Sequence, residues 1–368
     1  MRTDPQRWRL EQLRAGLASA KLDAALILHL PTVRYLTRFS GSNAALLVIG
    51  DGGGGAVHFF TDDRYAEQVK TELSPLPTLS VHITREFFSA AADICRAANV
   101  ATIGIEEEHI TLAQHAVLRK VMRGIKVRRL FSLDHLRMTK FASEVAAIGK
   151  AAQIASTVYA DVLAEVRVGM RECDVAAELS YRARRMGSEG DAFEIIVVAG
   201  DHGAFVHGRA SDRRLRKGDV VTVDFGCRVD GFHSDMTRTF YIGARIPSEV
   251  QRAWDTVCSA HQRAIEQLRP GVAAADVDRA AREVIEGAGY GEYFRHSLGH
   301  GLGIEVHEPP ALSPRNLKGT IPARCVVTVE PGIYVPGKFG MRLEDDVFVG
   351  EKGTIEILTT APRELACV

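Results

Sequence analysis

The chain contains one apolar run twice, and each copy is followed by an acidic residue and then, two positions later, by glycine. Residues 220–226 read VVTVDFG and residues 326–332 read VVTVEPG. The segments that precede these runs repeat as well, since a long helical pattern covers 143–166 in one case and 248–269 in the other. This recurrence restricts the fold, because it indicates two structural copies within one chain.

The two copies keep their register from helix to helix to strand. After each long helix comes a glycine, then four residues, then Asp-Val at a second helical pattern, with Asp174 and Asp276 as the expected N-caps. The copies are offset by about 102 to 106 residues throughout. The alternative is that two unrelated α/β segments share common strand residues. If the halves are copies, Asp224 and Glu330 occupy equivalent strand ends.

The first 138 residues follow a different pattern. Helical and strand periodicities alternate there, with helices at 8–17, 85–100 and 110–122, a further helix opening at 61–63, and strands at 24–30, 44–50, 56–60 and 103–106. We expect DGGGG (51–55) to be a hairpin turn, because it lies between two strands and lacks the Lys-Ser/Thr of a phosphate-binding loop. The sequence thus predicts an α+β protein, with an α/β domain over 1–138 and a duplicated domain over 139–368.

Charge and hydropathy exclude several classes of protein. Lys+Arg and Asp+Glu both number 46, so neither a generally basic nucleic-acid binder nor an acidic tail is indicated. No apolar stretch reaches the roughly 18 residues of a membrane span, and MRTDPQRWRL at the start lacks the apolar core of a signal peptide. The six cysteines have no C-x-x-C spacing, which is typical of reduced thiols. We therefore expect a cytoplasmic protein without nucleic-acid or membrane partners.

Four acidic residues and one histidine form a candidate ligand set. Asp224 and Glu330 end the repeated strands, and the hairpin after each strand returns with a further acid, Asp235 or Glu344. The GHGLG run adds His300, between glycines that let backbone and ligand approach closely. Burying several carboxylates together is costly unless cations neutralise them. These hard ligands favour Mn²⁺, Fe²⁺ or Co²⁺, accommodate Zn²⁺, and match two divalent ions better than one. We expect Mn²⁺.

The chain resembles the creatinase/aminopeptidase "pita-bread" family of metallopeptidases, which contains methionine aminopeptidase, aminopeptidase P and prolidase. The resemblance covers about residues 140–360 and lies in five ordered motifs, VVTVDFG, HSDMTRTF, HSLGHGLGIEVHEPP, VVTVEPG and GMRLEDDV. Residues 34–48 and 59–68 also resemble the smaller N-terminal domain of aminopeptidase P and prolidase. Methionine aminopeptidases lack that domain, so the resemblance favours the proline-directed branch. It implies a pseudo-twofold catalytic domain with two metal ions.

The resemblance implies a role for each ligand. Asp224 would bind one metal ion, and Asp235 and Glu344 would bridge both ions. His300 and Glu330 would complete the set of ligands of the second ion. Glu330 would also carry a proton between the attacking water and the leaving nitrogen, as a general acid and base.

Four further residues match family positions. His207 and His307 would hydrogen-bond the scissile carbonyl and the developing oxyanion, although the match leaves open which of them polarises the carbonyl. His296 would line the substrate pocket, with a packing role as the alternative. Arg342 would support the site by meeting a carboxylate.

Several neighbouring residues are assigned no direct role. Thr237 and Arg238 follow Asp235 and are expected to support the ligands from behind. We interpret His202, His233 and His261 as ordinary surface or turn residues.

The activity that the resemblance implies is metal-dependent hydrolysis of the bond between an N-terminal residue and a following proline. This bond is a tertiary amide without an N–H, so peptidases that grip that hydrogen lose a contact. Our preference is an aminopeptidase P acting on proline-containing peptides, and the alternative is a prolidase restricted to Xaa-Pro dipeptides. A dipeptidase needs a cation for the free carboxylate, for which Arg342 and the basic run 209–217 are candidates.

Other classes fit the sequence less well. Creatinase, and non-catalytic binding proteins of the same fold, lack the metal ligands that this chain retains. A nucleotide-dependent enzyme would need a phosphate-binding loop or a G-x-G-x-x-G after a strand, and neither is found in the sequence. The family also implies a homodimer formed through the N-terminal domain.

Overall fold

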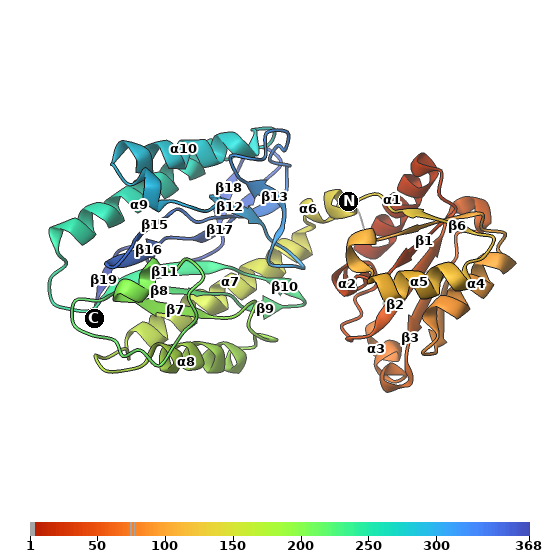
Figure 1. The fold of residues 1–368 in the computed structure, drawn as a ribbon, viewed down its shortest axis with the longest axis horizontal. Helices are drawn as coiled ribbons and strands as arrows, with labels where there is room; N and C mark the ends of the chain where they lie inside the picture. Colours follow the sequence, from red (N-terminus) through yellow and green to blue (C-terminus); the bar gives the residue numbers. More distant parts are fainter. Residues whose placement is uncertain (1–3, 74–75, 77) are drawn as a thin grey trace. The chain divides into compact units, whose positions relative to one another are not determined.

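A computed structural model describes residues 4–73, 76 and 78–368. The chain divides into two compact units that meet in the sequence between Leu136 and Arg137, here called unit 1 and unit 2 (Figure 1). Both combine helices and strands, which confirms the predicted α+β class. In the part of the chain that is described, no helix is long and apolar enough to cross a bilayer.

Unit 1 is built on a six-stranded sheet in the order β4-β3-β2-β1-β5-β6. The pairs β1–β2 and β2–β3 are antiparallel, whereas β3–β4, β1–β5 and β5–β6 are parallel. Every residue of β1 and β2 is buried, which explains their unbroken apolar sequences. The strands are β1 (Ala24–Ile27), β2 (Ala44–Ile49), β3 (Val57–Thr61), β4 (Leu79–Ile83), β5 (Thr102–Ile105) and β6 (Lys126–Arg129).

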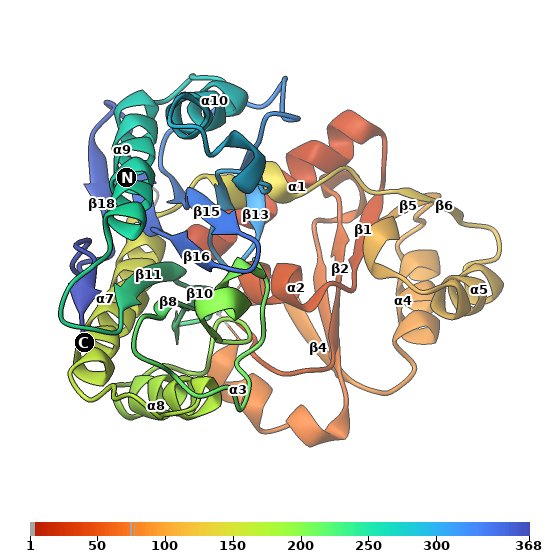
Figure 2. The ribbon, with the colours of Figure 1, turned by 60° about the vertical axis from the view of Figure 1, so that its left-hand side comes forward.

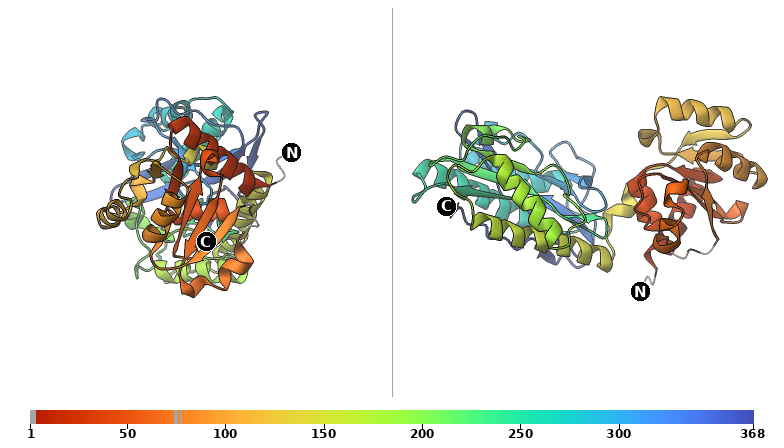
Figure 3. Two further views of the ribbon diagram at one scale, coloured as in Figure 1. Left: turned by 90° about the vertical axis from the view of Figure 1, so that its right-hand side faces the viewer. Right: turned by 90° about the horizontal axis from the view of Figure 1, so that it is seen from below.

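Helices pack against this sheet (Figure 3, left). Asp4 caps the first helix by accepting from two backbone N–H groups, and Thr111 with Gln114 forms a capping box on the fifth. The helices are α1 (Pro5–Ala20), α2 (Leu30–Thr37), α3 (Gln68–Glu72), α4 (Phe87–Ala97) and α5 (Leu112–Val121), and α6 (Asp134–Met138) spans the boundary with unit 2 in the sequence. The hairpin turn predicted at 51–55 is confirmed, because β2 and β3 pair antiparallel on either side of it.

Two boundaries predicted in unit 1 are wrong. The strand expected over 24–30 ends at Ile27, because Leu30 and Pro31 begin α2, and proline favours the first turn of a helix. The helix expected from 61–63 begins only at Gln68, since the Asp62 side chain caps a short 3₁₀ turn instead.

Unit 2 contains the duplicated arrangement that the sequence predicts, a helix pair packed on antiparallel strands. In the first half the strands form the sheet β19-β11-β8-β7, and the helices lie side by side along it (Figure 3, right). The elements are α7 (Ala142–Leu163), α8 (Glu172–Arg185), β7 (Ile196–Ala199), β8 (Val220–Phe225), β9 (Arg228–Val229), β10 (Phe232–His233), β11 (Met236–Tyr241) and β19 (Ala366–Cys367).

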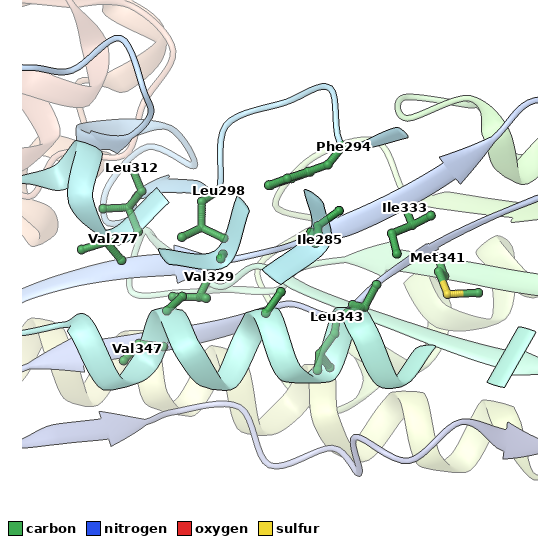
Figure 4. Packing of buried hydrophobic residues seen from close by; sticks show 14 of the residues in the cluster. Val277, Ile285, Phe294, Leu298, Leu312, Val329, Ile333, Met341, Leu343 and Val347 are labelled. Atoms are coloured by element: carbon green, nitrogen blue, oxygen red, sulfur yellow. The ribbon is translucent and has the colours of Figure 1, made fainter. Parts of the chain in front are cut away.

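The second half repeats the plan with the sheet β13-β12-β14-β17-β18. Its helices bury an apolar face against β14 and β17, in a core that includes Val277, Ile285, Val329 and Val347 (Figure 4). The elements are α9 (Ser248–Gln267), α10 (Ala274–Gly287), β12 (Gly299–Gly301), β13 (Glu308–Leu312), β14 (Cys325–Val329), β17 (Asp345–Val349) and β18 (Ile355–Ile357). Each half thus has its own hydrophobic core. The strand ends of both halves that are not covered by these helices can line one common site.

A hairpin of β15 (Gly332–Val335) and β16 (Phe339–Arg342) ties the halves together. It runs beside β8 and β11 (Figure 2). Thr222 of β8 donates to the Gly340 carbonyl at 3.0 Å, and Thr239 of β11 donates to the Arg342 carbonyl at 3.0 Å. These bonds place Arg342, which belongs to the second half, against the strands of the first half.

The N-caps predicted for the second helix of each half are wrong by three positions. The N-caps are Arg171 and Ala273, and Asp174 and Asp276 lie at the third position of the first turn. The Asp174 side chain nevertheless accepts from the Arg171 backbone N–H at 3.1 Å, so the acid stabilises the helix start from inside the turn.

Candidate active site

The acidic residues of the two halves lie at corresponding ends of antiparallel strand pairs. In the first half, Asp224 is near the end of β8, and Asp235 directly precedes its partner β11. In the second half, Glu330 directly follows β14, and Glu344 directly precedes its partner β17. Each half therefore supplies two carboxylates from the end of one strand and the start of the next.

These acids line one cavity of about 740 Å³ within unit 2. Part of its wall is apolar and comes from Phe193, Ile195, Ile196 and Val206. The structure brings all of the sequence-predicted site residues to this cavity: His207, Asp224, Asp235, His296, His300, His307, Glu330, Arg342 and Glu344.

The His300 ring faces two of the acids. Its Nε2 lies 3.6 Å from Asp235 Oδ2 and 3.5 Å from Glu330 Oε1. Its Nδ1 donates to the Gly301 carbonyl at 3.0 Å, which leaves the lone pair on Nε2 free to bind a cation. Ligand atoms of Asp235, His300 and Glu344 lie within 4.8 Å of one another, as a metal site requires.

Burial and mutual repulsion disfavour the charged forms of these acids. Burial, followed by the charge of Glu344, holds the pKa of Asp235 well above its usual value. Burial, followed by the charge of Glu330, does the same to the pKa of Glu344. Burial also raises the pKa of Glu330 to about 8, although Arg342 opposes this shift. Without cations the cluster would hold protons at neutral pH.

Arg342 is a buried cation that connects the acids of both halves. Its Nη2 contacts Asp224 Oδ2, and its Nε donates to Thr237 Oγ1 at 2.9 Å. Thr237 Oγ1 in turn donates to Glu344 Oε2 at 2.6 Å. The expectation that Arg342 meets a carboxylate agrees with these contacts. Its side chain is 4% exposed and three hydrogen bonds hold it inside the protein, which favours a supporting role over substrate binding.

The donor set fits divalent metal ions. The buried Asp224 Oδ1 has no hydrogen-bond partner among the described residues, and an unpaired buried carboxylate oxygen is costly. The four carboxylates share the cavity with Arg342 as their buried counter-charge. Cations at Asp224, Asp235, His300, Glu330 and Glu344 would satisfy the unpaired oxygen and neutralise the remaining charge.

His296 is fixed by two hydrogen bonds. Its Nδ1 donates to the Ser297 carbonyl at 2.8 Å, and its Nε2 accepts from Tyr334 Oη at 3.0 Å. Tyr334 Oη itself accepts from Arg342 Nη1 at 2.6 Å. Burial, followed by the charge of Arg342, lowers the pKa of His296 to about 3, so the ring is neutral.

His307 packs against the metal-ligand candidate His300, with ring centroids 4.3 Å apart. Burial, followed by His307, lowers the pKa of His300 to about 4. Burial, followed by His207, also lowers the pKa of His307. A neutral His300 is the form that binds a metal, and a neutral His307 keeps one N–H to donate to a substrate oxygen.

The glycines around His300 serve a purpose that the sequence analysis described only in part. A Cβ at Gly299 would collide with the Thr328 carbonyl of β14, and one at Gly301 would collide with the Pro309 carbonyl of β13. A Cβ at Gly303 would meet the Glu308 carboxylate. The close approach is therefore between backbones, which lets β12 fit between its two neighbours.

The interpretation of three other histidines as surface or turn residues is wrong for His261 and incomplete for the others. His261 is 1% exposed, and its Nε2 lies 3.1 Å from Asp345 Oδ2. His202 lies in a 3₁₀ turn, as expected, but its Nδ1 is 2.9 Å from the buried Glu172. His233 Nδ1 lies 3.2 Å from the Gly303 carbonyl. None of these contacts has a signal in the sequence.

Sequence reasoning also missed Asp346, whereas it expected the support that Arg238 gives. Asp346 is 0% exposed and accepts from the Asp235 backbone N–H at 3.1 Å, and only its place in the LEDDV run could have marked it. Arg238 donates to the Glu344 carbonyl at 2.6 Å and to Asp345 Oδ1 at 2.7 Å. The expectation that Arg238 supports the ligands from behind agrees with this position.

Two family models match the chain. The model of metallopeptidase family M24 matches residues 146–351, and that of the creatinase/prolidase N-terminal domain matches residues 9–139. These matches confirm the resemblance found in the sequence motifs and the pairing of the two kinds of domain.

Relatives and solved structures agree with the family models. An Xaa-Pro dipeptidase of Pyrococcus furiosus is 33% identical over 362 residues, covering 97% of this chain and 99% of the relative. The structure of an Xaa-Pro dipeptidase from Bacillus anthracis matches with a TM-score of 0.92 at 31% identity, covering 99% of this chain and 100% of the other. That of an X-Pro aminopeptidase from Thermotoga maritima matches with a TM-score of 0.88 at 36% identity, covering 98% and 100%.

Proposed function

This chain belongs to metallopeptidase family M24, and we propose that it is an exopeptidase that hydrolyses the bond between an N-terminal residue and a following proline. The observation that carries the proposal is the cavity in which four carboxylates and a neutral imidazole converge from both halves of a duplicated domain. The names of the related dipeptidases and of the related aminopeptidase supply the proline specificity.

Asp224, Asp235, His300, Glu330 and Glu344 would hold two divalent ions, with Mn²⁺ as our expectation. When bound, such ions supply Lewis-acid activation of water and of the scissile carbonyl. Glu330 would take the proton of the attacking water and deliver it to the leaving proline nitrogen. The support for this role is its position in the cavity, 3.5 Å from His300 Nε2.

Three histidines would act on the substrate. His207 and His307 would donate hydrogen bonds to the carbonyl oxygen as negative charge develops on it. His296, held by Tyr334 and Ser297, would form a fixed wall beside the proline ring. The apolar side chains of Phe193, Ile195 and Val206 would exclude water and contact that ring.

Within this activity we propose a dipeptidase as the first candidate, because two of the relatives compared above bear that name. Our preference from the sequence is an aminopeptidase P, although the motifs leave the choice open, and this second candidate is supported by the aminopeptidase structure at 36% identity. The two activities differ in whether the substrate peptide can continue beyond the proline.

One assay separates these candidates. The Mn²⁺-loaded protein is given Ala-Pro, Ala-Pro-Ala and Ala-Ala, with Glu330→Gln as the inactive control. Cleavage of Ala-Pro alone supports a dipeptidase, and cleavage of both proline peptides supports an aminopeptidase P. If neither proline peptide is cleaved, or Ala-Ala is cleaved equally well, the proposed specificity is wrong.

We also propose a homodimer formed through unit 1. Strand β4 lies at an edge of its sheet and exposes Val81 and Ile83, which are 43% and 45% exposed. An exposed apolar edge strand favours pairing with another chain. Light scattering after size exclusion should give twice the 40.2 kDa chain mass, and Val81→Lys should lower it. A monomer at micromolar concentration contradicts the proposal.

A further inference from the structure

The cavity wall carries a second arginine, whose environment is the opposite of that of Arg342. Arg209 lines the cavity two residues after His207, and its side chain is 81% exposed. Its one ion pair among the described residues joins Nε to Glu194 Oε2 at 3.2 Å, and the Glu194 side chain is itself 64% exposed. An ion pair in water is weak, so another carboxylate can take the place of Glu194.

The other arginine of the wall, and the acid that follows His307, are already engaged inside the protein. Arg342 is occupied by Asp224, Thr237 and Tyr334 inside the protein. Glu308 is paired with Lys140, whose Nζ lies 2.9 Å away. Among the described lysines and arginines that line the cavity, Arg209 is thus the one with its guanidinium open to a ligand.

We propose that Arg209 binds the free α-carboxylate of the substrate and so determines the preference for dipeptides. A guanidinium presents parallel N–H donors that match the two oxygens of a carboxylate. In an Xaa-Pro dipeptide this carboxylate follows the scissile bond by a single residue, which spans at most about 3.6 Å. The carboxylate receptor must therefore lie next to the group that binds the scissile carbonyl, and Arg209 is two residues from His207.

Glu194 has a matching role. In the absence of substrate it holds Arg209 at the cavity wall, and it competes with the incoming carboxylate for the guanidinium. A longer peptide has no carboxylate at this position and leaves the pair intact. This inference rests on the proposed Xaa-Pro activity and adds the residue that binds the C-terminal carboxylate of the substrate.

The test compares two substrates that differ only in one charge, Ala-Pro and Ala-Pro-amide. For the Mn²⁺-loaded wild type, the ratio of kcat/KM for Ala-Pro to that for Ala-Pro-amide should exceed one. Arg209→Gln should lower the ratio about tenfold, through a higher KM for Ala-Pro, because it removes a charge-assisted hydrogen bond. Arg209→Lys should recover part of the ratio, since it restores the charge without the fork.

Two further variants complete the test. Glu194→Gln should raise the ratio, because it removes the competitor for Arg209. Arg263→Gln, which removes an arginine of α9 that is 52% exposed, should leave the ratio unchanged. The proposal is overturned if Arg209→Gln lowers kcat/KM equally for both substrates, or for neither. A wild type that cleaves neither substrate overturns the proposed function instead.

Discussion

Lys140 and Glu308 form a buried ion pair beside the cavity. Lys140 Nζ lies 2.9 Å from Glu308 Oε2, and the two side chains are 2% and 1% exposed. Lys140 Nζ also donates to the Arg137 carbonyl at 2.7 Å, and Glu308 Oε1 accepts from the Glu305 N–H at 3.2 Å. Because Glu308 directly follows His307, this pair fixes one wall of the candidate active site.

Removing the lysine should be strongly destabilising. Lys140→Met leaves the Glu308 carboxylate buried without its cation, which costs about 3–5 kcal/mol in other buried pairs. Urea unfolding of unit 2 measures this loss. Lys140→Met combined with Glu308→Leu should recover most of the stability. The control is Lys338→Met, which breaks an exposed pair with Glu249 and should leave the unfolding midpoint unchanged. If Lys140→Met and Lys338→Met lower the free energy of unfolding equally, burial does not determine the strength of the Lys140–Glu308 pair.

Divalent ions should stabilise the protein, and Glu344 should be needed for this. Saturation at a hundred times the Kd adds about 2.7 kcal/mol, because the ion binds only the folded state. Glu344→Gln should raise the Tm of the metal-free protein, since a neutral amide does not have to take up a proton on burial as the Glu344 carboxylate does, and abolish the rise in Tm on adding Mn²⁺. Glu356→Gln on β18 is the exposed control. A metal-free variant less stable than the metal-free wild type would argue against repulsion in the cluster.

The metal-free protein should lose stability as pH rises. The pKa of Glu330 is raised to about 8 from its usual 4.5, so its contribution is complete below pH 4.5 and is lost as pH approaches 8. Asp235 and Glu344 act in the same direction, because burial holds the pKa of each well above its usual value. Thermal denaturation from pH 5 to 8 in chelator tests this sign.

The same protons should be released when a metal binds. Calorimetric titration with Mn²⁺ at pH 7 in two buffers of different ionisation enthalpy counts them, and the affinity should rise with pH. A binding enthalpy that is independent of the buffer would show that the carboxylates are already charged in the metal-free protein.

Glu172 should position the loop that carries His207. It is fully buried and accepts from Ala199 N at 2.9 Å, Ser211 Oγ at 2.6 Å and His202 Nδ1 at 2.9 Å, so it joins the start, middle and end of the loop. Glu172→Gln places an amide among these donors and should raise KM several-fold.

The metal content separates positioning from loss of the site. It should stay at the wild-type value in Glu172→Gln, because none of the ligand candidates lies in this loop. Glu178→Gln, on the same helix and in a half-buried pair with Arg182, should change neither quantity. A Glu172→Gln protein with normal KM would remove the positioning role.

Much of the fold follows from order along the chain. The two VVTV strands, the helix pairs and the offset between them depend on local periodicity, which a linear sequence displays directly. The acids are found in the same way, because Asp224 and Glu330 each directly follow an apolar VVTV run that predicts a strand. Element boundaries do not follow from periodicity alone, as at Leu30, where the neighbouring proline begins a helix.

The sequence by itself determined the candidate metal ligands and substrate-binding residues that reach the cavity, and only the tertiary structure decided which partner each polar atom has. Arg342 meets Asp224 across 118 positions, and Lys140 meets Glu308 across 168. His261 is buried beside Asp345 although nothing around it in the sequence marks it as such. The physical reason is that a buried charge selects whatever counter-charge packing brings within reach, and packing joins segments whose separation along the chain carries no signal.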